Sequence, residues 1–176
     1  KSDIVLATKD GMSIRFHQGD GSAMGCATAR VKGIELDAED AVIGMVIVRR
    51  EATLLVVSEK GYGKRSELVE YRVQKRGGKG IITLKKTEKT GRMVALKEVI
   101  PDDELMMITR HGVVIRVPVE GISVIGRNTQ GVRVMNLDAG DNLVDVARVV
   151  KEDDNGTEEP TGDEAAAPAD ETGGEA

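Results

Sequence analysis

The residues best placed to do chemistry surround three glycines in the stretch VQKRGGKG, residues 73–80. Glycine within an ordered element costs roughly 0.5–1 kcal/mol relative to alanine, so three of them in so short a stretch need a reason. Turn geometry is one reason. The other is a close approach of the backbone to an anion, with Lys75, Arg76 and Lys79 supplying positive charge and Gln74 holding the loop.

Charge is segregated along the chain. Residues 1–150 hold 24 Lys and Arg against 20 Asp and Glu, whereas residues 151–176 hold one lysine and ten acids. The segment from Lys60 to Lys97 alone holds twelve cations against three acids. Such a concentration indicates a polyanion site, with a solvated lysine-rich face as the alternative.

Residues 151–176 have alanine as their only apolar residue type, and we expect them to be a disordered acidic tail. Either the tail only keeps the protein soluble, or it competes with an anionic ligand for the basic body.

Composition excludes several classes of protein. No run of about 18 apolar residues occurs, so we expect no membrane partner. Cys26 is the only cysteine among the 176 residues, so neither an internal disulfide nor a cysteine-based zinc site is expected. The chain begins at Lys1 without a methionine, and we expect it to be a piece of a longer protein.

A repeat of about fifty residues organises the body. Three segments align on a glycine, at spacings of 50 and 51 residues. The aligned glycines are Gly11, Gly61 and Gly112, the cations four positions later are Arg15, Arg65 and Arg116, and the next aligned glycines are Gly33, Gly80 and Gly131. Such internal periodicity indicates a repeat architecture.

Each repeat predicts four short strands, in the first repeat near Ile4–Ala7, Ser13–Phe16, Gly33–Leu36 and Ala41–Val48. The tripeptides KDG, EKG and RHG predict tight hairpins, and the runs AVIGMVIV, MVALKEVI and LVDVARVV predict fully buried strands. The sequence therefore predicts an all-β, propeller-like fold with blades near 1–51, 52–101 and 102–150. Because three blades rarely close a ring, we expect more blades upstream.

The loop before the second aligned glycine carries cations in every repeat. These are Arg30 and Lys32 in the first, Lys75, Arg76 and Lys79 in the second, and Arg127 in the third, and Lys64 and Arg65 follow the second hairpin. Scarce aromatics and no tryptophan disfavour a single-stranded partner, and no recognition helix is evident. Phosphate contacts with duplex DNA remain, with an acidic protein partner as the alternative.

Catalytic motifs are not found. GRNTQG is not followed by Lys-Ser or Lys-Thr, so it is no phosphate-binding P-loop. His17 and His111 stand alone, and PDDE at residues 101–104 lies where a repeat needs a turn. We expect no catalytic residue, cofactor or metal site in this chain.

Gln74, Lys75, Arg76, Gly77, Gly78, Lys79 and Gly80 match at all seven positions the gyrase A box, Gln-[Arg/Lys]-Arg-Gly-Gly-[Arg/Lys]-Gly. With the flanking stretches AMGCATARVKGI, KGYGKRSELVEY and GRNTQGVRVMNL, residues 3–150 resemble the C-terminal domain of the bacterial DNA gyrase A subunit. The resemblance implies a β-pinwheel of six four-stranded blades that exchange a strand between neighbours, of which this chain holds roughly the last three.

The resemblance also implies a function. The domain wraps duplex DNA around its basic perimeter with positive handedness, and presents DNA for strand passage so that gyrase introduces negative supercoils. The holoenzyme, of two A and two B subunits, uses ATP and Mg²⁺ in other domains: the N-terminal catalytic domain of gyrase A and the gyrase B subunit. It acts in the cytoplasm on the bacterial chromosome.

One feature departs from the family pattern. The family's principal box lies in the first blade, whereas here one repeat follows the box, so residues 74–80 resemble a second, box-like loop. The similar topoisomerase IV A subunit has a degraded box. The intact motif therefore favours gyrase.

Overall fold

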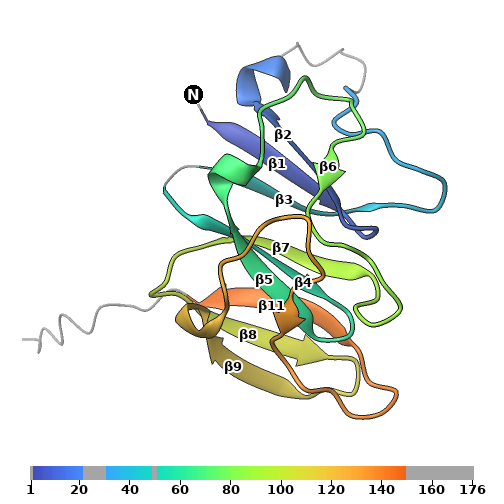
Figure 1. The fold of residues 1–176 in the computed structure, drawn as a ribbon, viewed down its shortest axis with the longest axis vertical. Helices are drawn as coiled ribbons and strands as arrows, with labels where there is room; N and C mark the ends of the chain where they lie inside the picture. Colours follow the sequence, from blue (N-terminus) through green and yellow to red (C-terminus); the bar gives the residue numbers. More distant parts are fainter. Residues whose placement is uncertain (1, 22–30, 49–50, 150–176) are drawn as a thin grey trace, which may run out of the picture.

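The computed structural model of the chain describes residues 2–21, 31–48 and 51–149. Within these ranges the strands form three antiparallel sheets, two of four strands and one of three. Figure 1 shows the sheets one after another along the long axis of the molecule. The strands are β1 (Asp3–Thr8), β2 (Met12–His17), β3 (Val42–Val48), β4 (Thr53–Ser58), β5 (Tyr62–Glu67), β6 (Ile81–Ile82), β7 (Met93–Val99), β8 (Glu104–Thr109), β9 (Val114–Pro118), β10 (Val132–Arg133) and β11 (Leu143–Val149).

Each repeat begins with the predicted hairpin. β1 pairs with β2, β4 with β5 and β8 with β9, all antiparallel. The turn glycines Gly11, Gly61 and Gly112 have φ values of +86°, +79° and +86°. Only glycine adopts this backbone region at little cost, which explains why it recurs at a fixed spacing.

The outermost strand of a sheet comes from the following repeat. The first sheet has the order β3-β1-β2-β6, and β6 belongs to the second repeat. The second sheet has the order β10-β5-β4-β7, and β10 belongs to the third repeat. This is the strand exchange that the resemblance implies. Our prediction of a strand at residues 33–36 is wrong, because β6 takes the place beside β2.

The third sheet has the order β11-β8-β9, so within the described residues it has three strands rather than the predicted four. No described repeat follows it to donate an outermost strand, and β9 forms its edge. The all-β class is confirmed. Three short 3-10 turns, η1 (Gln18–Gly21), η2 (Leu68–Glu70) and η3 (Val119–Gly121), follow the hairpins.

The core lies between successive sheets, and β4 is covered on both faces. Leu54 packs in the cluster shared with the first sheet, and its neighbour Leu55 packs in the cluster shared with the third. Successive residues of a strand point to opposite faces, so β4 needs a continuous apolar run. The long strand β7 packs between β3 and β11 at the inner side of the sheets.

Full burial was predicted for all three long apolar runs. For β11 this is wrong, because only its residues Leu143 and Val146 are buried, and for β3 it is wrong as well. None of its residues is buried, and Met45 is 60% exposed. β3 lies at the edge of the first sheet, with β1 as its only hydrogen-bonded neighbour among the described residues. In the part of the chain that the structure describes, no helix is long and apolar enough to cross a membrane.

Candidate nucleic-acid interface

The segment from Val73 to Gly80, which we call the box loop, is fastened to the sheet of the preceding repeat. The N–H of Gln74 donates to the carbonyl of Arg15 at 2.8 Å, and the N–H of Gly77 donates to that of Gly33 at 2.6 Å. In the opposite direction, the N–H of Glu35 donates to the carbonyl of Gly78 at 2.9 Å. The box loop leads into β6, which pairs with β2 of the first sheet (Figure 1).

Two of the glycines have an identifiable structural reason. Gly80 has a φ of +78°, and a Cβ there would lie 2.1 Å from the Ser13 carbonyl oxygen, which no side chain tolerates. Gly77 has a φ of +81°, but a Cβ there would meet only ordinary contacts. Gly78 does not have a positive φ, and a Cβ there would meet nothing nearer than 3.8 Å. The glycine at 80 therefore serves the junction between repeats.

The cations of the box loop differ in role. Arg76 donates from Nε to the Asp20 carbonyl at 2.6 Å and from Nη1 to the Lys32 carbonyl at 3.2 Å, so it ties the loop to the first repeat. Lys75 and Lys79 are exposed, and their ammonium groups make no ion pair with a described carboxylate. Ammonium groups on exposed stems are suited to phosphate contacts.

Gln74 lies half-buried at the base of the box loop. Its side-chain Nε2 is buried and has no hydrogen-bond partner among the described residues. We predicted that the Gln74 side chain holds the loop, but within the described residues no hydrogen bond from its amide nitrogen does so. The main-chain N–H of Gln74 does hold the loop, through its bond to the carbonyl of Arg15.

Two further cations lie with the box loop. Lys32 is exposed, and its carbonyl accepts the bond from Arg76. Arg72 is also exposed and immediately precedes the loop. It was not among the predicted site residues, although its charge was counted in the segment from Lys60 to Lys97. Arg30 was predicted beside Lys32, and it lies outside the described residues.

Arg65 and Lys64 do not lie on the surface. Arg65 is 7% exposed, and its Nε donates to the Ile122 carbonyl at 2.8 Å. Lys64 is fully buried, and its Nζ donates to the carbonyls of Gly126, at 2.6 Å, and Arg127. Burial lowers the pKa of Lys64 to about 8. Both residues bind the third repeat's loop to the second sheet, so they do not belong to the proposed interface.

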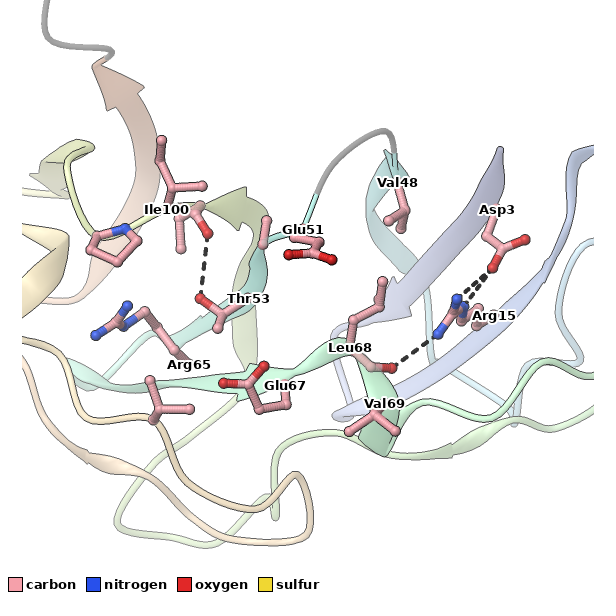
Figure 2. A pocket seen from close by; sticks show the side chains of 14 residues that line it. Asp3, Arg15, Val48, Glu51, Thr53, Arg65, Glu67, Leu68, Val69 and Ile100 are labelled. Atoms are coloured by element: carbon pink, nitrogen blue, oxygen red, sulfur yellow. Dashed lines mark hydrogen bonds and ion pairs between the residues drawn. The ribbon is translucent and has the colours of Figure 1, made fainter. Parts of the chain in front are cut away.

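Arg15 makes the equivalent junction one repeat earlier. Its Nη1 donates to the carbonyls of Leu68 and Tyr71, at 3.0 and 3.2 Å. Its other nitrogens bind the Asp3 carboxylate, at 2.6 and 2.8 Å. Figure 2 shows Arg15 between Asp3 and Leu68, in a groove whose wall also carries Arg65. Of the three regularly spaced arginines, Arg15 and Arg65 thus lie at junctions between repeats, whereas Arg116 binds Glu104 within the third repeat.

The groove in Figure 2 is a poor anion site. Asp3, Glu51 and Glu67 line it with the two arginines, and the remaining lining is mostly apolar. Burial opposes ionisation of Asp3, but hydrogen bonds from Arg15 and His17 outweigh it and hold the pKa below its usual value.

Arg127 occupies the place in the third repeat's loop that Arg76 has in the box loop. Its Nη1 donates to the Ile82 carbonyl at 2.7 Å, and its N–H donates to the Glu70 carboxylate at 3.3 Å. The side chain is half-buried. It reaches β6, so it links the two loops at neighbouring sheet edges.

The arrangement places the loops at one side of the sheets. β6 and β10 are edge strands, and the opposite edges, β3 and β7, lie at the inner side. The exposed cations Lys32, Arg72, Lys75 and Lys79 therefore lie along the outer side of the first sheet. A row of exposed cations on a rigid edge is suited to a polyanion with regularly spaced charges.

Comparisons with known proteins agree on one family. The model of the DNA gyrase C-terminal domain, a β-propeller, matches residues 2–49, 52–99 and 103–149. The chain is 41% identical over 155 residues to the A subunit of DNA gyrase from Haloquadratum walsbyi and 36% identical over 151 residues to that from Escherichia coli. These alignments cover 87% and 86% of the chain, but only 18% and 17% of the relatives' own length.

Solved structures show the same similarity. A structure of the DNA gyrase A C-terminal domain matches with a TM-score of 0.77 and 29% identity, over 85% of this chain and 51% of that one. A C-terminal domain of DNA topoisomerase IV matches with a TM-score of 0.78 and 20% identity, over 85% of this chain and 47% of that one. At 20% identity, the second match supports the fold alone.

Proposed function

The chain belongs to the DNA gyrase C-terminal β-propeller family, and from that premise we propose that it binds duplex DNA without sequence preference and wraps it along the outer side of its sheets. The observation that carries the proposal is the box loop: it is fastened to the preceding sheet through its backbone, while Lys75 and Lys79 expose their charge to solvent.

The mechanism uses contacts with phosphates. Ammonium groups neutralise phosphates and release counterions, which provides affinity independent of base sequence. Because the box loop is held by main-chain bonds to Arg15 and Gly33, the cations are presented from a rigid edge. Contacts that continue from one sheet edge to the next favour a curved duplex, since bending brings more phosphates against protein.

The place of this activity in a larger enzyme is also a proposal. The chain presents DNA to the N-terminal catalytic domain of gyrase A, which breaks and rejoins a duplex, while the gyrase B subunit supplies ATP hydrolysis. The holoenzyme uses Mg²⁺ and introduces negative supercoils in the cytoplasm. In this proposal the chain itself carries no catalytic residue.

Two alternatives differ in partner. A topoisomerase IV subunit has the same blades, and the intact box together with identities of 36–43% to gyrase A subunits favours gyrase. A propeller that docks an acidic protein would use the same cations.

A bending assay with the 176-residue chain tests the proposal. A duplex labelled with a donor and an acceptor at its two ends should show increased energy transfer on binding, with similar affinity for duplexes of unrelated sequence. A polyaspartate competitor should displace the DNA only at a large excess of charge. Binding of polyaspartate as tight as that of DNA, with no change in energy transfer, would favour the acidic protein partner.

A further inference from the structure

A second group of cations surrounds Tyr62, at the junction of the second and third repeats. A hollow of about 360 Å³ is lined by Lys60, Tyr62, Lys89 and Arg133 and by residues of the segment 135–142. Lys60 lies in the turn between β4 and β5, Tyr62 begins β5, Lys89 precedes β7, and Arg133 ends β10. We call these four residues the Tyr62 pocket.

The tyrosine ring holds two of the cations. The Arg133 Nη2 donates to the Tyr62 hydroxyl at 3.0 Å, and its guanidinium carbon lies 5.4 Å from the ring centroid. The Lys89 Nζ lies 5.4 Å from the same centroid. Both distances are within the range of cation–π attraction. The hydrogen bond from Arg133 lowers the pKa of Tyr62.

Little negative charge faces the pocket. Asp141 lines it, but that carboxylate is 2% exposed and accepts the N–H groups of His111 and Asn142, at 3.1 and 2.8 Å. Lys60 donates to the carbonyl of Glu88. Among the described residues, neither Lys89 nor Arg133 is seen in an ion pair with a carboxylate. The hollow is thus lined by three cations and one carboxylate, so its net charge is positive.

The fold does not require these cations. Tyr62 and Arg133 are partners across β5 and β10, and the equivalent partners in the first sheet are Met12 and Ile82. An apolar pair thus supports the same exchanged strand. The charges at the second junction are therefore an addition to the repeat.

Lys89 has no cationic counterpart in the other repeats. The same main-chain hydrogen bond closes the loops before β3, β7 and β11. The donors are the N–H groups of Lys9, Glu59 and Arg110, and the acceptors are the carbonyls of Ala41, Arg92 and Asn142, respectively. Counting back three residues from these carbonyls places Ala38 and Ala139 at the position of Lys89.

We infer that Tyr62, Lys60, Lys89 and Arg133 form a phosphate-binding pocket that takes a phosphodiester group of the bound duplex. The inference rests on the proposed DNA binding and extends it from the box loop to the junction of the second and third repeats. A phosphate oxygen there accepts bonds from the ammonium and guanidinium groups, and the ring of Tyr62 keeps the cations in place when no phosphate is bound.

The test uses substitutions that the repeats themselves contain. Lys89→Ala and Arg133→Ile install the residues found at equivalent positions of other repeats, so the double variant should fold. Arg116→Ala with Lys9→Ala removes the same charge from residues that do not line the pocket, and serves as the control. All are made in the full chain.

One readout is a pH titration of tyrosine, followed by the absorbance of tyrosinate, without and with inorganic tripolyphosphate as the probe. The chain has no tryptophan and two tyrosines, Tyr62 and the buried Tyr71. Burial raises the pKa of Tyr71, so Tyr62 titrates first. Bound phosphate draws positive charge from the Tyr62 hydroxyl, so the first transition should move to higher pH in the unsubstituted chain and the control, and stay in place in the double variant.

The second readout is the salt dependence of duplex affinity. Removing one phosphate contact should flatten the slope of log K against log salt by about 0.9 in the double variant relative to the control. The pocket would be overturned if the double variant had the same slope as the control and tripolyphosphate left the tyrosine transition of the unsubstituted chain in place. If the unsubstituted chain still binds DNA, that result leaves the proposed function standing. A moved transition with an unchanged slope would assign the pocket to a free polyphosphate and overturn its role in DNA binding. Absence of DNA binding by the unsubstituted chain would overturn the proposed function itself.

Discussion

The main-chain N–H of Gln74 donates to the carbonyl oxygen of Arg15 at 2.8 Å, across the boundary between two repeats. The next repeat makes the same contact, from Ile125 to Arg65 at 2.9 Å. In both places the bond begins the segment that leads into the outermost strand of the preceding sheet. The box loop is therefore a structural junction as well as a candidate surface for DNA.

Replacing Gly80 with alanine should destabilise the junction. The new Cβ would clash with the Ser13 carbonyl oxygen in addition to the strain of a positive φ. Gly112 has a similar φ of +86° but open space around it. We expect Gly112→Ala to cost about 1 kcal/mol of unfolding free energy and Gly80→Ala at least about twice as much. Urea denaturation measures both, and equal losses would contradict a tight junction at Gly80.

Arg76→Ala should lower stability more than Lys79→Ala. Arg76 donates to two carbonyls of the first repeat, and hydrogen bonds from a charged donor contribute about 1.5–3 kcal/mol. Lys79 is exposed, so its removal should change the unfolding free energy by no more than about 0.5 kcal/mol. If both variants unfold at the same urea concentration, Arg76 does not tie the loop to the first sheet.

Lys64 should make stability depend on pH. Its pKa of about 8 in the folded chain lies below the ordinary value of 10.5, so between these values the unfolded chain binds more protons. The free energy of unfolding should then rise with pH through this window, by at most about 3 kcal/mol, and be lowest below pH 8. Lys64→Met removes this contribution, while Tyr62 and Tyr71 titrate in both proteins.

Urea titrations from pH 7 to pH 10 measure the difference between the two proteins. The unsubstituted chain should gain more stability over this range than Lys64→Met. Parallel curves would mean that Lys64 keeps its ordinary pKa and is not buried as a cation.

Deleting residues 151–176 should strengthen DNA binding. The segment lies outside the described residues, and the prediction rests on its charge, one lysine against ten acids. Removing a polyanion that competes for the same cations should lower the dissociation constant most at low salt. Equal affinities of the two chains for a duplex at low salt would leave the tail without a role in binding.

Local patterns predicted the hairpins well. Gly11, Gly61 and Gly112 set the turns through their own backbone conformation, which depends on few distant contacts. The residues alone did not predict which sheet the outermost strands join, because β6 and β10 contain two residues each and pair with the preceding repeat. A pairing made across a repeat boundary leaves no local signal.

The candidate site was predicted in part. Lys75 and Lys79 are exposed as expected for phosphate contacts, whereas Lys64 and Arg65 are buried at a junction. The sequence shows the charge of a cation but not which carbonyl accepts from it. The Tyr62 pocket was missed because Arg133 belongs to the next repeat and meets Tyr62 only through the strand exchange.

The most direct test of DNA binding by the box loop is the salt dependence of duplex affinity for the unsubstituted chain and for Lys75→Ala with Lys79→Ala. Both substituted side chains are exposed, so the fold should be retained and is checked by circular dichroism. We predict a linear fall of log K with log salt, and a slope flatter by about 0.9 for each phosphate that the variant no longer neutralises. An unchanged slope in a folded variant would contradict the proposed role, because the box loop would then serve the junction between repeats alone.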